Sequence, residues 1–338
     1  MAKTKFLFLL SILVLILLLP LSNVQAEEQT TDDQDTMAQE LNLGVSKPGF
    51  LPSNPLYFIK DWWRGIKLGL TFNQEKKEEL RLKQANEILL EIDTLFNQPV
   101  DQKTQEKVSQ MLDKYQEQSA KFKTKAEELK SNEKIQKLIE QNAAWEIRRQ
   151  YLLKKLENRS ELKQEIKDKV RETVRSSLGD LASELSFLED QEKIEATLNS
   201  AIDYVQTAQL IFSLDFLDQL RTELPAAAQG VVSNTRQRTV GTLRRRLVDL
   251  DKITRDNLLL EFNSLNPSEP IRSEVQATAN QAENISNFIL QTKKNNITVE
   301  KKTVDQAIEE TMRLFDQSSN SNQQIQPVIN PESESVDY

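Results

Sequence analysis

Apolar residues recur along most of the chain at intervals of three and four, the spacing of one face of an α-helix. The clearest stretch repeats every seven residues, through Val108, Tyr115, Phe122 and Leu129. Such a repeat is typical of helices that pack nearly antiparallel along a coiled-coil-like seam. No stretch alternates apolar and polar residues over the length of a strand, so the sequence predicts no sheet.

The first predicted helix follows Asn54, which can cap a helix, and Pro55, a residue favoured at the first helical position. A second helix, beginning near Asn73, follows within a few residues and has an apolar stripe of its own. An apolar stripe must be covered, so we expect these two helices to form a hairpin that buries Trp63. Replacing Trp63 with alanine would then cost about 3–5 kcal/mol. The stripe of the first helix consists of Leu56, Ile59, Trp63, Ile66 and Leu70.

Later helices are predicted up to the C-terminal tail, which gives about eight to ten helices in all. Gly179 is expected to cap the end of the fifth helix. One continuous helix is predicted before Pro225 and another before Pro267. The last two helices are expected over residues 271–292 and 298–315. The predicted fold class is therefore all-α, with antiparallel helical hairpins or an elongated bundle and disordered termini.

The N-terminus has the layout of a secretory signal peptide. Lys3 and Lys5 precede an apolar run from Phe6 to Leu19, and small residues follow at Val24 and Ala26. A membrane-spanning helix needs roughly 20 apolar residues, and this run is shorter. We expect export and cleavage after Ala26, and the alternative is an uncleaved membrane anchor.

The segment from Pro48 to Leu90 resembles the opening of a bacterial family of exported proteins, the domain-of-unknown-function family numbered five-six-six-seven. The resemblance extends more weakly to about residue 185. The family pattern carries a histidine in the helix around Trp145, and this chain has none, so any role of that histidine is absent here. Since the family has no established activity, the resemblance implies an exported helical protein and assigns no site. The matching residues are Pro52, Ser53, Pro55, Tyr57, Lys60, Phe72, Lys76, Lys77, Glu79 and Leu80.

Five segments are predicted along the chain. Residues 1–26 form the signal peptide, and residues 27–45, which are acidic and polar, form a disordered linker. Residues 46–185 form the helical domain that resembles the family, and residues 186–317 form a second helical unit. The boundary between them rests on the expected cap at Gly179, a poorly periodic stretch after it and the fading of the resemblance. Residues 318–338 are polar and are expected to be a disordered tail.

The absence of histidine and cysteine narrows the possible chemistry. Histidine is the commonest general base and metal ligand, and the ferritin-like di-metal site requires Glu-x-x-His. Carboxylate pairs such as Glu78 and Glu79 remain, but charge-rich helices produce such pairs without any function. We therefore expect no enzyme activity, no metal site and no cofactor. The net charge of −8 argues against binding to nucleic acid.

Basic residues at a seven-residue spacing form the first candidate binding surface. Arg238, Arg245 and Lys252 lie opposite the apolar stripe of the helix predicted before Pro267 and would form a solvent-facing cationic ridge. This ridge suits an anionic envelope polymer or an acidic partner. The alternative is a solvated helix face with no partner.

Trp62 and Trp63 form the second candidate, because they lie beside Lys60, Arg64 and Lys67. Aromatic and cationic side chains suit the headgroup layer of a membrane. The alternative, which the hairpin prediction favours, places Trp63 in a buried stripe and leaves the cations in solvent.

Together these features predict an exported, non-catalytic helical protein that acts as a binding or scaffolding module of the cell envelope. Its partner would be an envelope protein or an anionic envelope polymer. Contact with the membrane would be transient, during export, unless the signal peptide is retained. The alternatives are the exported sensory arm of an envelope signalling system and, third, an enzyme that acts on envelope polymers.

Overall fold

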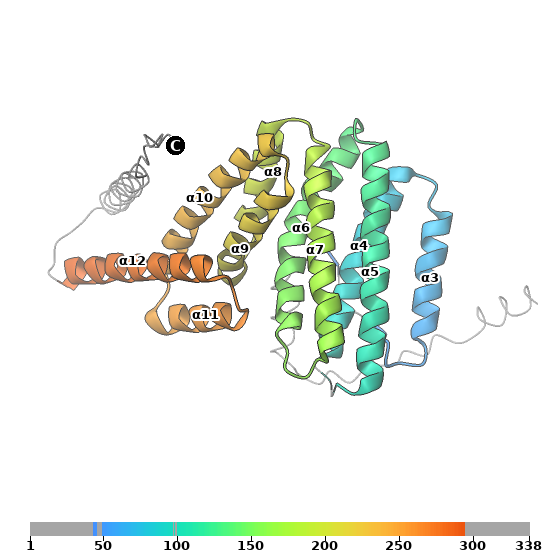
Figure 1. The fold of residues 1–338 in the computed structure, drawn as a ribbon, viewed down its shortest axis with the longest axis horizontal. Coiled ribbons are helices and arrows are strands. Elements are labelled where there is room, and N and C mark those ends of the chain that lie inside the picture. The colour runs from blue at the N-terminus through green and yellow to red at the C-terminus, as the bar shows by residue number, and fades with distance from the viewer. Residues whose placement is uncertain (1–42, 46–48, 97, 99, 295–338) are drawn as a thin grey trace, which may run out of the picture. The chain divides into compact units, whose positions relative to one another are not determined.

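The computed structural model describes residues 43–45, 49–96, 98 and 100–294. Within this part the protein is all-α and has no strand, which confirms the predicted fold class (Figure 1). The predicted signal peptide, most of the linker, the helix over 298–315 and the C-terminal tail lie outside the described residues. The described helices are α3 (Tyr57–Leu70), α4 (Gln74–Leu95), α5 (Gln102–Glu128), α6 (Glu133–Glu157), α7 (Gln164–Ser186), α8 (Gln191–Asp203), α9 (Thr207–Glu223), α10 (Ala226–Val248), α11 (Lys252–Ser264) and α12 (Glu269–Lys294).

Four long helices form a bundle in which α4 packs against α5, α5 against α7, α7 against α6 and α6 against α4. The seven-residue repeat of α5 provides one seam of this bundle, as predicted. Val108, Tyr115 and Phe122 are fully buried, and Leu129 is half-buried just after the helix. Because these side chains share one face of α5, their burial fixes the rotation of the helix in the bundle.

Short polar side chains determine where several helices begin. At each of these positions a side-chain oxygen accepts a hydrogen bond from a backbone N–H in the first turn, which satisfies a donor that the helix leaves unpaired. The predicted helix start near Asn73 is confirmed by this cap at α4. The capping residues are Asn73, Asp101, Asn132, Asp190 and Asp251.

The prediction that Gly179 ends a helix is wrong. Helix α7 continues through Gly179 to Ser186, because Leu181 and Leu185 beyond the glycine are buried in the core. Packing of these leucines outweighs the cost of about 1 kcal/mol for glycine inside a helix. The chain turns a few residues later, at Glu189, whose φ is 57°.

Two stretches predicted as single helices are each divided by a short turn. The first is interrupted between α8 and α9, where Gln206 and Gln209 form a capping box. The second is interrupted between α10 and α11, where the Asp251 carboxylate accepts the backbone N–H of Thr254 at 3.0 Å. The apolar spacing continues across both turns, and the polar caps therefore decide the breaks.

Helices on either side of the predicted boundary at residue 185 pack together, since α8 and α9 both contact α6. The rings of Tyr151 and Phe212 lie 5.8 Å apart in an edge-to-face arrangement. The guanidinium of Arg148 donates to the carbonyl oxygen of Tyr204 at 3.0 Å. The two groups of helices therefore share one core.

The end of the predicted linker belongs to this core. Leu43 is buried, and its carbonyl oxygen accepts a hydrogen bond from the Asn86 amide at 2.7 Å. Gly44 has a φ of 70° and lies so close to Trp145 that an added Cβ would be 2.6 Å from the indole ring. Only glycine suits this position, because any side chain would meet both the unfavourable backbone conformation and the ring.

Candidate functional site

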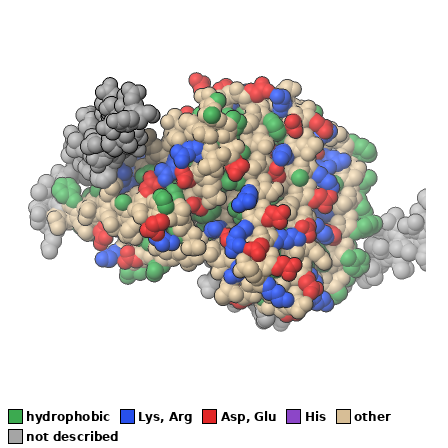
Figure 2. All heavy atoms as spheres, viewed as in Figure 1, with side chains coloured by type: hydrophobic (Ala, Val, Ile, Leu, Met, Phe, Trp, Pro, Cys, Tyr) green, Lys and Arg blue, Asp and Glu red, His purple; other side chains and the backbone are tan. Residues whose placement is uncertain are grey.

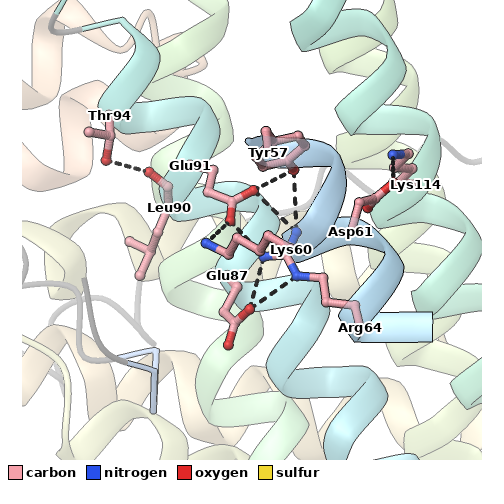
Figure 3. Close-up of polar contacts among 9 residues, drawn as sticks. All are labelled: Tyr57, Lys60, Asp61, Arg64, Glu87, Leu90, Glu91, Thr94 and Lys114. Carbon is pink, nitrogen blue, oxygen red and sulfur yellow. Dashed lines mark hydrogen bonds and ion pairs between the residues drawn. The ribbon is translucent and has the colours of Figure 1, made fainter. Parts of the chain in front are cut away.

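Helix α3 faces the bundle with its polar side. Tyr57, Lys60 and Arg64 lie on one stripe of α3 and converge on two carboxylates of α4, Glu87 and Glu91 (Figure 3). Arg64 donates to Glu91 at 2.6 Å and to Glu87 at 2.8 Å, and the Tyr57 hydroxyl donates to Glu91 at 2.7 Å. Lys60 completes the group with an ion pair to Glu91 at 2.5 Å. We call these five residues the α3 tether.

The centre of the tether, Arg64 with Glu91, is buried, and the charges of the tether compensate one another. The Glu91 side chain is 0% exposed and that of Arg64 is 9% exposed. Burial lowers the pKa of the Arg64 guanidinium, but the Glu91 and Glu87 carboxylates outweigh it and leave that pKa above its ordinary value. Burial, together with the charge of Glu91, raises the pKa of Tyr57. Arg64 therefore stays charged and Tyr57 stays protonated at neutral pH.

Contacts outside the tether also hold the α3 region in place. Next to the tether on the bundle side of α3, Asp61 forms an ion pair with Lys114 of α5 at 2.6 Å (Figure 3). The Gln84 amide donates to the backbone carbonyl oxygen of Arg64 at 3.2 Å. Just before the helix, Lys107 of α5 donates to the carbonyl oxygen of Pro52 at 2.5 Å. Polar contacts to α4 and α5 therefore hold α3 and its N-terminal approach.

The opposite side of α3 is apolar and points away from the bundle. The exposed fractions are 67% for Phe58, 66% for Trp62, 51% for Trp63 and 66% for Leu70, and Ile59 is 46% exposed. We call these five residues the outward face. The prediction that a hairpin of the first two helices buries Trp63 is wrong, because the tether turns the polar side of α3 inward.

Figure 2 shows the outward face as hydrophobic side chains gathered along the right edge of the view, where Figure 1 places α3. By helical spacing this face covers roughly 140° of the circumference without a charged residue. Phe72, two residues beyond the C-terminus of α3, is 87% exposed. Contiguous exposed apolar surface of this kind marks interaction sites on soluble proteins.

Trp63→Ala is expected to change the free energy of unfolding by less than about 1 kcal/mol, because half of the side chain is already in solvent. The indole ring also contacts Lys67, whose Nζ lies 5.9 Å from the ring centroid. Urea unfolding followed by circular dichroism measures this change. A loss of 3–5 kcal/mol would instead show that Trp63 is covered in solution.

Glu91→Ala is expected to release α3 while the bundle stays folded, because Arg64 and Lys60 lose their shared carboxylate. The loss of these buried, charge-assisted hydrogen bonds should lower the free energy that holds α3 on the bundle by about 3 kcal/mol. Amide hydrogen exchange in α3 should then be roughly hundredfold faster. Mass-spectrometric exchange measures the rate. Glu79→Ala is the matched control, since Glu79 pairs with Lys83 on the same helix. Equal protection of α3 in both variants would contradict the role of the tether.

The predicted ridge is divided between two helices. Arg238 and Arg245 lie on α10, but Lys252 is the first residue of α11. Arg238 pairs with Asp203 at 2.9 Å and Lys252 with Glu283 at 3.4 Å. Acidic neighbours therefore neutralise two of the three cations, and the turn between α10 and α11 breaks the seven-residue alignment.

A hollow of about 540 Å³ lies among α9, α10 and α12. Arg236 in its wall pairs with Glu274 at 3.1 Å, and Arg221 pairs with Asp218 at 3.2 Å. Both guanidinium groups are thus paired with carboxylates of the protein, although the Arg236 Nε has no hydrogen-bond partner. The hollow is therefore a weaker candidate for a binding site than the outward face of α3.

The bundle interior contains a polar group that the sequence analysis did not identify. Asn142, Glu146 and Arg149 of α6 meet Glu184 of α7, and all four are buried. Arg149 lies 3.2 Å from Glu146, and the Asn142 amide donates to Glu184 at 2.6 Å. We call these residues the bundle cluster. No group of three or more carboxylates is positioned to hold a metal ion in the described part of the chain, and the absence of catalysis and of cofactors stays a prediction.

The fold and the site define an all-α bundle protein that presents an apolar helix face to its surroundings. Residues 49–239 match the family described as Domain of unknown function (DUF5667), and the chain belongs to this family. The match confirms the predicted family and continues beyond residue 185, where the resemblance was expected to end. No curated protein and no solved structure matches the chain.

Proposed function

We propose that the protein is an exported, non-catalytic binding or scaffolding module of the cell envelope, and that the outward face of α3 is its binding surface. One observation carries the proposal: a buried polar tether holds an uncharged aromatic face in solvent. An amphipathic helix normally buries its apolar side in the core. Here the side that contacts the bundle is polar, which leaves the apolar side available to a partner.

The N-terminal signal supports the envelope as the place of action. A positively charged start, a short apolar run and small residues at a cleavage position are the features of an export signal. Export would bring the outward face into contact with the components of the envelope. The ridge, with two of its three cations paired to acidic neighbours, supports an anionic partner less well.

Phe58→Glu combined with Trp62→Glu, the α3 double variant, is expected to lower retention in the envelope fraction at least about tenfold. Burying each aromatic side chain against the partner contributes about 1.5–3 kcal/mol to the free energy of binding. A carboxylate in its place removes that contribution. Quantitative immunoblotting of envelope and soluble fractions measures retention. Both wild-type side chains are mostly exposed, so the melting temperature should stay close to that of wild type.

The matched control is Ile253→Glu combined with Leu260→Glu, the α11 double variant, which adds the same charge at two exposed apolar positions. It should fractionate like wild type. A photo-crosslinking residue at position 62 should capture an envelope component that one at position 253 does not. Equal retention of wild type and both double variants would overturn the proposed function.

A further inference from the structure

We propose that the partner of the outward face is the surface of a lipid bilayer, with α3 lying in the headgroup layer parallel to the membrane. This inference rests on the proposed function and names its partner. Two tryptophans, a phenylalanine and two aliphatic side chains occupy the outward face. Tryptophan and phenylalanine on one face of an amphipathic helix are typical of helices that bind membrane interfaces.

The borders of the face fit this orientation. Lys67 is exposed beside Trp63, with its Nζ 5.9 Å from the indole centroid. A lysine at the edge of an apolar stripe can extend its ammonium group towards headgroups and water while its stem stays on apolar surface. On the inward side, Arg64 and Lys60 are held by the tether. The charged groups of α3 therefore lie beside or behind the outward face.

The length of α3 favours lying in the surface over crossing the membrane. A helix of 14 residues is about 21 Å long, whereas the hydrocarbon core is about 30 Å thick. In the described part of the chain no helix is long and apolar enough to span a bilayer. Shallow insertion needs only the side chains that already point away from the bundle.

A second copy of the chain fits the outward face less well. Each copy carries a net charge of −8, so two copies repel one another as they approach. A neutral bilayer surface has no such net charge, and every inserted apolar side chain adds to binding.

Insertion of apolar side chains, and not charge, should drive this binding. The tether neutralises Arg64 and Lys60, and the whole chain has a net charge of −8. Attraction to anionic lipid is therefore weak, and repulsion by the acidic protein opposes it. Binding to neutral phosphatidylcholine vesicles should equal or exceed binding to vesicles that contain phosphatidylglycerol, and should change little with salt.

Tryptophan fluorescence tests the inference in the full chain. The chain has three tryptophans; Trp145 is buried in the bundle, so Trp62 and Trp63 report on the outward face. Vesicles of phosphatidylcholine with brominated acyl chains should quench wild-type fluorescence and shift it to the blue. In the α11 double variant the response should match wild type. In the α3 double variant, which keeps Trp63, half-maximal quenching should require at least about tenfold more lipid.

Three results would overturn the inference. The first is wild-type fluorescence that brominated lipid does not quench. The second is protection of Trp62 and Trp63 from iodide quenching in the absence of lipid. Protection at every protein concentration would mean that the chain itself covers the outward face. Protection that appears only as a dimer forms in sedimentation would mean that a second copy covers it. The third is quenching that is the same in wild type and the α3 double variant.

The same variants separate this inference from the proposed function. If the α3 double variant loses envelope retention while lipid vesicles leave wild-type fluorescence unchanged, the outward face binds a protein or polymer and only the bilayer inference fails. If vesicles quench wild type but envelope retention does not depend on Phe58 and Trp62, the proposed function fails.

Discussion

Arg149→Met is expected to lower the free energy of unfolding by about 3–5 kcal/mol, the range for removing one partner of a buried ion pair. Arg149 is almost fully buried, lies 3.2 Å from Glu146 and donates to the carbonyl oxygen of Asn142 at 3.2 Å. Methionine has a similar length, so it fills most of the space but leaves the Glu146 carboxylate without a cation in the bundle interior.

Urea unfolding at pH 7 measures this loss. Arg175→Met, at an exposed position on α7, is the matched control and should cost less than about 0.5 kcal/mol. Adding Glu146→Gln to Arg149→Met removes the uncompensated charge and should restore roughly half of the lost stability. If the second substitution restores nothing, the cost comes from altered packing and not from charge.

Glu184→Gln is expected to make the protein more stable in alkaline solution. Burial raises the pKa of Glu184 to about 8, and Glu146 and Asp180 act in the same direction, while the Asn142 hydrogen bond and Arg149 oppose them. An ordinary glutamate titrates near 4.5. Between these two pH values the folded protein holds a proton that the unfolded chain has released. The free energy of unfolding therefore falls as pH rises through this window, by on the order of 4 kcal/mol.

Glutamine cannot ionise, and its side-chain oxygen can still accept the hydrogen bond from Asn142. The variant should resemble wild type at pH 4 and be more stable than wild type by a few kcal/mol at pH 9. Unfolding curves across this range, taken as the difference between variant and wild type, isolate Glu184 from other titrating groups. Glu172→Gln, at an exposed position on α7, should give no such difference. A difference for Glu184→Gln that is constant with pH would contradict the raised pKa.

The bundle cluster and the outward face should respond independently to substitution. The cluster lies inside the bundle on α6 and α7, whereas the outward face is on α3, which packs against α4. Substitutions in the cluster are expected to change stability without changing envelope retention. Substitutions of Phe58 and Trp62 are expected to do the reverse, because neither side chain is part of the core.

The fold class, the family and much of the bundle could be predicted from the amino-acid sequence. Helical spacing identified α5 and its buried seam, because a continuous stripe of apolar residues has only one way to face the core. The start of α4 near Asn73 was also predicted, since a capping side chain acts on the backbone only a few residues away. These are local signals, and their outcome does not depend on distant parts of the chain.

The length of α7 and the identity of the bundle cluster depend on the tertiary structure. The turns between α8 and α9 and between α10 and α11 were not predicted, because the apolar spacing continues across them and only local polar caps end the helices. At Gly179 the local preference for a cap gave way to the packing of leucines farther along α7. In the sequence, the residues of the bundle cluster cannot be distinguished from ordinary polar and charged residues on an exposed helix face. Only packing of α6 against α7 brings Glu184 to Asn142 and Arg149.

The orientation of α3 is the clearest case. Its sequence has a polar stripe through Tyr57, Lys60 and Arg64 as well as an apolar stripe, and helical spacing describes both equally well. Which stripe faces inward depends on what α4 presents, and α4 presents two carboxylates four residues apart, Glu87 and Glu91. The buried ion pairs that result turn the aromatic residues outward, a choice made by residues more than twenty positions away in the chain.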